Sequence, residues 1–126
     1  MKGLLFSLLF SLLVPVFLFA DDFDDAKKAH NQGNYSKAAE LFKTSCDNGN
    51  AKGCVMMGSY YHLGLGVERD YSKAVELYKK ACDGGFYLAC NNLGAMYSTG
   101  KGVKQDHSKA AELYKKSCEN GVAEGC

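Results

Sequence analysis

Small and apolar side chains recur at a helical spacing in three stretches of the chain. Between residues 35 and 46 they are Ala38, Leu41, Phe42 and Ser45, at positions i, i+3, i+4 and i+7. The matching positions 36 and 72 residues later hold Ala74, Leu77, Tyr78 and Ala81, and then Ala110, Leu113, Tyr114 and Ser117. This spacing marks one face of an α-helix. We therefore predict three amphipathic helices that bury the same face.

The ends of these helices are marked alike. Asparagine or aspartate precedes each start, where a side-chain oxygen can accept a hydrogen bond from a first-turn amide, and glycine follows each end as a left-handed stop. The residues are Asn34, Asp70 and Asp106 at the starts, and Gly49, Gly85 and Gly121 after the ends. On the solvated face, Glu76 and Lys80 are four residues apart, in the order that favours an ion pair.

A partner helix is expected before each of the two later amphipathic helices, over residues 52–62 and 88–98. Its packing columns hold Met57, Gly58 and Tyr61, and then Leu93, Gly94 and Tyr97. A glycine inside a helix lowers stability by roughly 1 kcal/mol relative to alanine, so its return in one column predicts a close approach of two helices there. In the first copy, an acidic run at residues 21–25 begins the corresponding helix, which continues to Gln32.

Short glycine-containing segments, Gly64–Gly66 and Gly100–Gly102, link the two helices of each later pair. A Gly-x-Gly pair can cradle a phosphate when it opens a helix and a third glycine follows. Here the pair follows a helix and lacks the third glycine. We interpret both segments as turns of a repeat.

The six cysteines repeat with the same period. They fall at intervals of 8, 28, 8, 28 and 8 residues, and residues 55–90 and 91–126 are identical at 17 of 36 positions without a gap. A fixed period of this length indicates a repeat array. The sequence thus predicts an all-α fold, an α/α superhelical solenoid of paired antiparallel helices.

Each cysteine pair spans the short turn between two helices, and antiparallel helices joined in this way bring the two residues within disulfide reach. The predicted bonds are Cys46 with Cys54, Cys82 with Cys90, and Cys118 with Cys126. A zinc site would favour Cys-x-x-Cys knuckles or Cys/His sets, and a redox centre would favour an exposed Cys-x-x-Cys; the sequence has neither. We expect structural disulfides, no metal site and no cofactor.

Residues 1–20 have the order of a secretory signal, with Lys2, then an apolar run, then Ala20 before an acidic stretch. Pro15 interrupts the run, which is short for a membrane anchor. Without Lys2, 14 basic residues face 14 acidic ones, so nothing in the charge balance favours nucleic acid or an anionic membrane. We expect a secreted or periplasmic protein with no stable membrane anchor, and disulfides suit an oxidising compartment.

The glycine, alanine and aromatic columns, among them Gly58, Tyr61, Ala74 and Tyr78, resemble the tetratricopeptide pattern lengthened to 36 residues, which is the Sel-like repeat. With a cysteine pair in every copy and a signal in front, the chain resembles the Helicobacter cysteine-rich protein family. The implied division is a signal peptide at 1–20, a first tetratricopeptide-like repeat at 21–54 with a loop four residues shorter, and Sel-like repeats at 55–90 and 91–126.

This resemblance implies a concave surface lined by the first helix of each pair. Carrying over the tetratricopeptide contact columns predicts the following ligand groove: Lys27, His30, Asn31, Lys52, Val55, Ser59, His62, Asn91, Asn92 and Ser98, flanked by Phe23, Leu63, Leu88, Ala95 and Thr99. The expected ligand is a peptide, a protein or a cell-wall-derived molecule.

Members of the resembled family are described as penicillin-binding proteins and β-lactamases, so β-lactam hydrolysis is the implied alternative. Ser98 to Lys101 spells Ser-x-x-Lys, but its partner elements are missing and the serine falls at a helix end. His30 and His62 share one column of adjacent copies without a carboxylate placed between them, which falls short of a zinc hydrolase set. The catalytic residues are therefore unknown.

The chain stops at Cys126, shortly after the third amphipathic helix. The face that carries Ala110, Leu113 and Tyr114 then lacks its usual cover, whereas solenoids need a polar cap at each end. We expect an array that is incomplete at this end, a longer parent chain, or end-to-end self-association.

Overall fold

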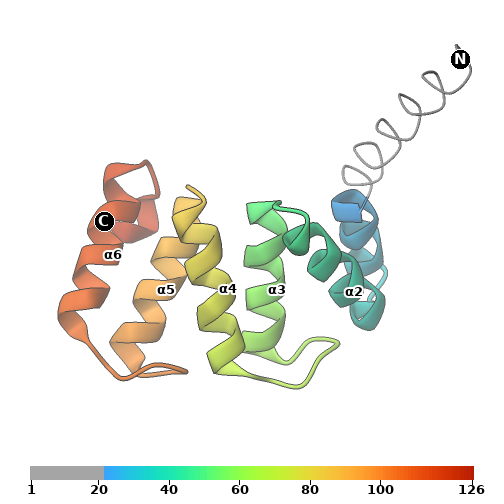
Figure 1. Ribbon diagram of the computed structural model, residues 1–126, viewed down its shortest axis with the longest axis horizontal. Helices are drawn as coiled ribbons and strands as arrows, with labels where there is room; N and C mark the ends of the chain where they lie inside the picture. Colours follow the sequence, from blue (N-terminus) through green and yellow to red (C-terminus); the bar gives the residue numbers. More distant parts are fainter. Residues whose placement is uncertain (1–21) are drawn as a thin grey trace, which may run out of the picture.

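The computed structural model describes residues 22–126 as a single row of helices (Figure 1). Residues 22–31 are helical and are followed by five α-helices and one 3₁₀ turn. Their bounds are α2 Tyr35–Asp47, α3 Ala51–Leu63, α4 Tyr71–Asp83, α5 Tyr87–Thr99, α6 His107–Glu119 and η1 Ala123–Gly125. The predicted signal sequence at residues 1–20 lies outside the described residues.

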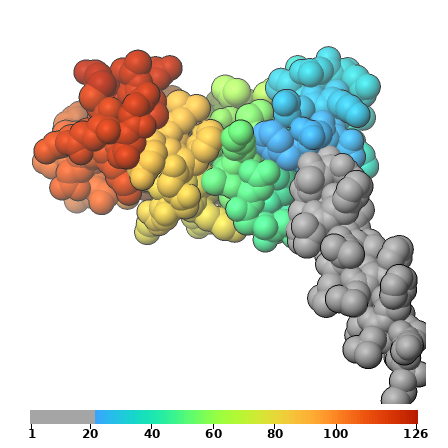
Figure 2. Space-filling model, turned by 90° about the horizontal axis from the view of Figure 1, so that it is seen from above, coloured from blue at the N-terminus to red at the C-terminus, as the bar shows by residue number. Residues whose placement is uncertain are grey.

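Consecutive helices pack against one another along the row, α2 on α3, α3 on α4, α4 on α5 and α5 on α6. The space-filling view shows the repeats following one another in sequence order (Figure 2). Both later pairs have seven residues between their helices, at 64–70 and 100–106, while the first has three, at 32–34. The all-α solenoid and the shorter first loop are therefore confirmed.

The helix starts follow the predicted caps. The side chains of Asn34, Asp70 and Asp106 accept hydrogen bonds from the amides of the third residue beyond, which satisfies a donor that has no partner inside the helix. The expected Glu76–Lys80 ion pair is absent from the ion pairs of residues 22–126, and the exposed pairs there are Lys43–Asp47, Lys109–Glu112 and Lys115–Glu119.

The buried side chains form two clusters along the row. One gathers around Phe42, Met57 and Tyr60, between segment 22–31, α2 and α3. The other runs through α4 and α5 and includes Tyr78, Leu93 and Met96. A solenoid buries its core between neighbours in this way rather than around one centre. Ala110 and Leu113 of α6 are also buried.

Glycines in the helices allow the predicted close approach. A Cβ built on Gly58 would lie 2.8 Å from the ring of Tyr78, and one built on Gly94 would lie 3.0 Å from the ring of Tyr114. In the two later helix pairs, the tyrosine of the second helix therefore lies directly over the glycine of the first helix. In the turns, Gly66 has a positive φ of 64° and lies against the backbone of Tyr35 at the start of α2, in the preceding repeat. This contact explains why the second residue of the Gly-x-Gly pair is glycine, and phosphate binding is not needed to explain it.

All three disulfides have the predicted pairing. The Cα atoms are 4.5 Å apart in Cys46–Cys54, 4.8 Å in Cys82–Cys90 and 4.9 Å in Cys118–Cys126, and no cysteine is free. Cys46–Cys54 joins the end of α2 to the start of α3, Cys82–Cys90 joins the end of α4 to the start of α5, and Cys118–Cys126 joins the end of α6 to the residue after η1. The first two bonds therefore fix one helix pair to the following one. Among residues 22–126, no helix has both the length and the apolar character needed to span a membrane.

Candidate functional site

The predicted groove residues lie on segment 22–31, α3 and α5, which are the first helices of the three pairs. We call the surface that these three elements form the first-helix face, and the surface formed by α2, α4 and α6 the second-helix face. Two hollows open on the first-helix face, one on each side of α3. The first is lined by Phe23, Lys27, His30, Asn31, Phe42, Lys52 and Met56, and the second by Ser59, His62, Leu63, Tyr78, Asn92 and Ala95.

The first hollow has a volume of about 390 Å³, with an apolar base and a basic rim. Phe23 packs edge-on against Phe42 with ring centroids 5.7 Å apart, and the ammonium of Lys27 lies 5.8 Å from the Phe23 ring. Beside them, Nδ1 of His30 lies 2.6 Å from the hydroxyl of Tyr60. Burial, and secondarily the nearby Tyr35, raise the pKa of Tyr60, so this phenol stays protonated and can donate to His30.

The second hollow has a volume of about 190 Å³. The Tyr78 ring crosses Gly58 from α4, and its hydroxyl then lies 3.1 Å from Oγ of Ser59. Burial raises the pKa of Tyr78, and the hydrogen bond from Ser59 offsets part of that rise. The pair is a neutral hydrogen bond at the base of the hollow rather than an activated nucleophile, because a phenol with a raised pKa stays protonated at neutral pH and provides no phenolate to act as a base.

His62, which lines the second hollow, lies beside a basic cluster outside it. The His62 ring meets the edge of the Tyr71 ring at 5.5 Å between centroids. The same Tyr71 ring has the guanidinium of Arg69 at 5.7 Å and the ammonium of Lys101 at 5.5 Å. The pKa of His62 is lowered, first by burial and then by the charges of Lys101 and Arg69.

The remaining predicted groove residues lie elsewhere. Val55 is only 6% exposed and belongs to the core around Tyr78. Asn91 is half-buried, and its side-chain oxygen is buried without a hydrogen-bond partner. Ser98 is half-buried near the end of α5, where its carbonyl oxygen accepts from Nε2 of Gln105 at 2.9 Å. Val55, Asn91 and Ser98 do not line either hollow.

The flanking residues follow a similar division. Phe23, Leu63 and Ala95 line the hollows, whereas Leu88 and Thr99 do not. Thr99 instead donates its hydroxyl to the carbonyl of Ala95 at 2.8 Å, and Leu88 is 39% exposed. In the Ser-x-x-Lys segment, the lysine ammonium is placed over the Tyr71 ring.

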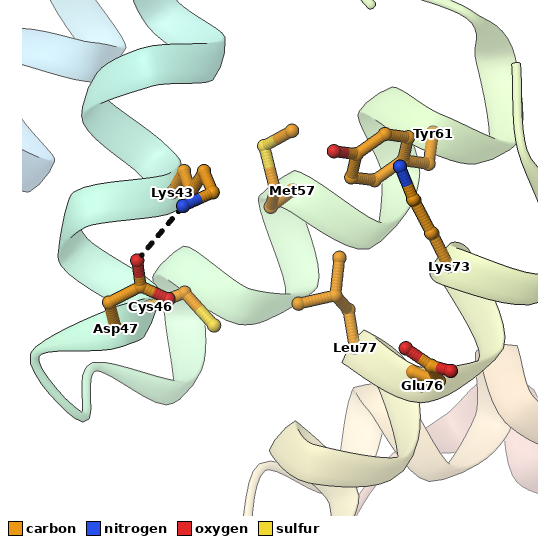
Figure 3. Close-up of a pocket in the computed structure, with 8 residues that line it drawn as sticks. All are labelled: Lys43, Cys46, Asp47, Met57, Tyr61, Lys73, Glu76 and Leu77. Carbon is orange, nitrogen blue, oxygen red and sulfur yellow. Dashed lines mark hydrogen bonds and ion pairs between the residues drawn. The ribbon is translucent and has the colours of Figure 1, made fainter. Parts of the chain in front are cut away.

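A third hollow of about 200 Å³ lies on the second-helix face and was not foreseen from the sequence (Figure 3). Its apolar part is formed by Cys46, Met57, Tyr61 and Leu77, and its rim carries the Lys43–Asp47 ion pair. Lys73 lies 5.2 Å from the centre of the Tyr61 ring. The sequence predicts Tyr61 and Leu77 as positions that pack helices together. Positions of this kind can also border a hollow between the helices.

Comparison with protein families matches the Sel1 repeat model to residues 28–50, 51–86 and 88–122. A Helicobacter pylori relative named "Putative beta-lactamase HcpE" is 44% identical over 45 residues, which are 36% of this chain and 13% of that protein. The chain therefore spans only about an eighth of the length of HcpE.

Two solved structures resemble this one. Helicobacter pylori cysteine rich protein B (HcpB) is 25% identical with a TM-score of 0.68, over 81% of this chain and 92% of that one. A protective antigen of uropathogenic Escherichia coli with an SLR fold is 34% identical with a TM-score of 0.67, over 69% of this chain and 19% of the antigen.

Proposed function

The chain belongs to the Sel1 repeat family, and from this premise we propose that it is a disulfide-stabilised binding module whose first-helix face holds an extended peptide or a protein segment. A cell-wall-derived peptide is included in this class. The observation that carries the proposal is the pair of hollows on either side of α3, each lined by apolar and polar side chains from successive helix pairs.

The two hollows suit an extended chain rather than one small molecule. Each has room for a side chain or two, and pocket surfaces that combine an apolar base with a few polar groups favour specific recognition. His30, Lys27 and Lys52 border the first, while Ser59, His62 and Asn92 border the second. An extended peptide that crosses α3 would place successive side chains in both, and the main-chain amides could reach the polar rims.

We propose that the binding takes place outside the cytoplasm, in the periplasm or the medium. Three disulfides use all six cysteines, and such bonds persist in oxidising compartments. The order of residues 1–20 supports export by a cleaved signal. The test is fractionation of cells that express the full chain, with intact mass before and after thiol alkylation. Reduced protein confined to the cytoplasm would overturn this assignment.

Binding to the first-helix face is tested with a library of 12-residue peptides displayed on beads and two matched variants. Ala95→Arg fills the second hollow, whereas Glu76→Arg alters the rim of the hollow on the second-helix face. Peptides selected on the unmodified chain should lose at least ten-fold in affinity with Ala95→Arg and remain unchanged with Glu76→Arg. Equal losses, or the reverse order, would overturn the proposal, and thermal unfolding of both variants controls for folding.

β-Lactam hydrolysis is the second candidate, and it rests on the name of HcpE over the matched 45 residues. Ser59 lines the second hollow, but its described hydrogen bond is to a neutral tyrosine. Turnover of the chromogenic cephalosporin nitrocefin by the purified chain, lost in Ser98→Ala or His62→Ala, would establish the activity. Absence of turnover at micromolar protein would retire it.

A further inference from the structure

Three basic side chains from different parts of the chain converge on one tyrosine ring. His62 comes from the end of α3, Arg69 from the turn before α4, and Lys101 from the turn after α5. Their charged or polar groups lie 5.5, 5.7 and 5.5 Å from the Tyr71 ring. Such contacts fix cations over an aromatic face. The tyrosine thus holds two cations and one imidazole close together.

No carboxylate offsets this cluster among the described contacts. None of the ion pairs of residues 22–126 includes Arg69 or Lys101. Asp70 lies next to Arg69 in the chain, but its carboxylate caps α4 by accepting from the amide of Lys73 at 3.0 Å. Glu68 and Arg69 share the rim of a separate hollow with Tyr61 and Lys73. Arg69 and Lys101 therefore have no carboxylate partner among the described residues and could pair with an anion of a ligand.

The next copy of the repeat does not carry the same cluster. Thirty-six residues later, His62 is replaced by Ser98, Arg69 by Gln105, and Tyr71 by His107. The helices of both copies are nevertheless formed, α4 and α6 are both capped by an aspartate, and α3 and α5 both end at a left-handed glycine. Solenoid packing therefore does not require these basic residues. His62 lines the second hollow, and the Tyr71 ring keeps Arg69 and Lys101 next to His62, outside the hollow itself.

We propose that His62, Arg69 and Lys101 form a subsite for a carboxylate of the peptide bound on the first-helix face. This inference rests on the proposed function and names the ligand chemistry at one end of it. A planar guanidinium and a mobile ammonium can each donate to a carboxylate oxygen. The imidazole of His62 reaches the hollow itself and adds a donor on the peptide side. The preferred ligand has an acidic side chain or a free C-terminus at this point.

The experiment uses the full mature chain and the same 12-residue peptide library, with half of the peptides ending in a free carboxylate and half amidated. Selected peptides should carry a free C-terminus, Asp or Glu at a fixed distance from their apolar residues. Conversion of that carboxylate to an amide should lower affinity about ten-fold or more, which is the range for a charge-assisted hydrogen bond. The loss should shrink at high salt. Comparison of the two termini distinguishes a side-chain carboxylate from a C-terminal one.

Two double variants of equal charge test the location. Arg69→Gln with Lys101→Gln removes the two fixed cations of the subsite, whereas Lys79→Gln with Lys104→Gln removes two exposed lysines outside it. The first variant should lose the preference for carboxylate over amide, and the second should retain it. The subsite would be overturned if peptides bound the unmodified chain without preferring a carboxylate, or if both double variants lost the same affinity. Either result would leave the proposal of peptide binding intact. A library without any binder would overturn both.

Discussion

The contact between Ser45 of α2 and Gly53 of α3 provides a test of how closely these two helices pack. Oγ of Ser45 is fully buried without a hydrogen-bond partner, and a Cβ built on Gly53 would lie 2.6 Å from it. The same Cβ would lie 2.8 Å from the Ser45 Cβ and 2.9 Å from the amide nitrogen of Cys46. We therefore expect Gly53→Ala to strain the junction between α2 and α3.

The second repeat shows how that strain can be relieved. The residues that correspond to Ser45 and Gly53 are Ala81 and Ala89, both 0% exposed. The disulfide Cα atoms there are 4.8 Å apart instead of 4.5 Å. An alanine pair is therefore accommodated when the serine oxygen is absent and the helices separate slightly.

The magnitudes follow from these contacts. Overpacking costs typically 1–3 kcal/mol, and alanine in place of glycine in a helix returns about 1 kcal/mol, so Gly53→Ala should lower the free energy of unfolding by about 0–2 kcal/mol. Ser45→Ala removes an unpaired buried hydroxyl and should raise it by about 1 kcal/mol. The double variant should be more stable than the sum predicts, with a coupling of about 1 kcal/mol.

Urea unfolding at constant pH with the disulfides intact measures all four members of this cycle, and the slopes check that the transition is unchanged. Ala89→Gly in the second repeat is the matched reverse change and should lower stability by about 1 kcal/mol. Additive effects of the two first-repeat substitutions, or a stabilising Gly53→Ala alone, would refute the claim that Ser45 and Gly53 compete for the same space.

Three further outcomes are expected. Replacement of Cys82 and Cys90 by serine opens a loop that the disulfide closes at a separation of 8 residues. This change should lower the free energy of unfolding, measured in urea, by about 2.5 kcal/mol. An unchanged free energy would show that the bond does not constrain the unfolded chain. Because the pKa of His62 is lowered in the folded chain, the unfolded chain takes up that proton first, and stability should fall as pH drops through roughly 6.5 and below. His62→Gln should reduce this fall in urea midpoints between neutral and acidic pH while His107→Gln does not, and identical pH profiles would contradict the assignment. Tyr78→Phe should lower the melting temperature by the equivalent of about 1 kcal/mol, because Ser59 loses its partner, and an unchanged melting temperature would show that this bond contributes nothing net.

Most of the fold could be predicted because the same pattern of residues occurs three times in the sequence. The cysteine intervals predicted each disulfide pairing. The recurring glycine at positions 58 and 94 predicted a close approach of two helices, and the structure shows that Tyr78 and Tyr114 make it. The boundaries agreed within about one residue because caps such as Asp70 are local signals.

The candidate site was harder to predict from the sequence, because it depends on distances between residues of different repeats. The basic cluster joins His62, Arg69 and Lys101, which are separated by a turn or by a whole repeat, and no periodic pattern connects them. Val55 occupies a contact column of the resembled family yet lies in the core, because the next helix pair covers it. The expected Glu76–Lys80 pair did not form, which is common for exposed charges with little net gain from pairing.

The central claim is that the first-helix face, and not the second-helix face, binds the ligand. Amide NMR spectra of the ¹⁵N-labelled mature chain, titrated with a selected peptide, test it most directly. We predict that the shifted resonances gather in segment 22–31, α3 and α5, with the largest changes at Ser59, His62 and Asn92. Changes centred on Lys43, Tyr61 and Leu77, around the hollow between α2 and α4, would contradict the account.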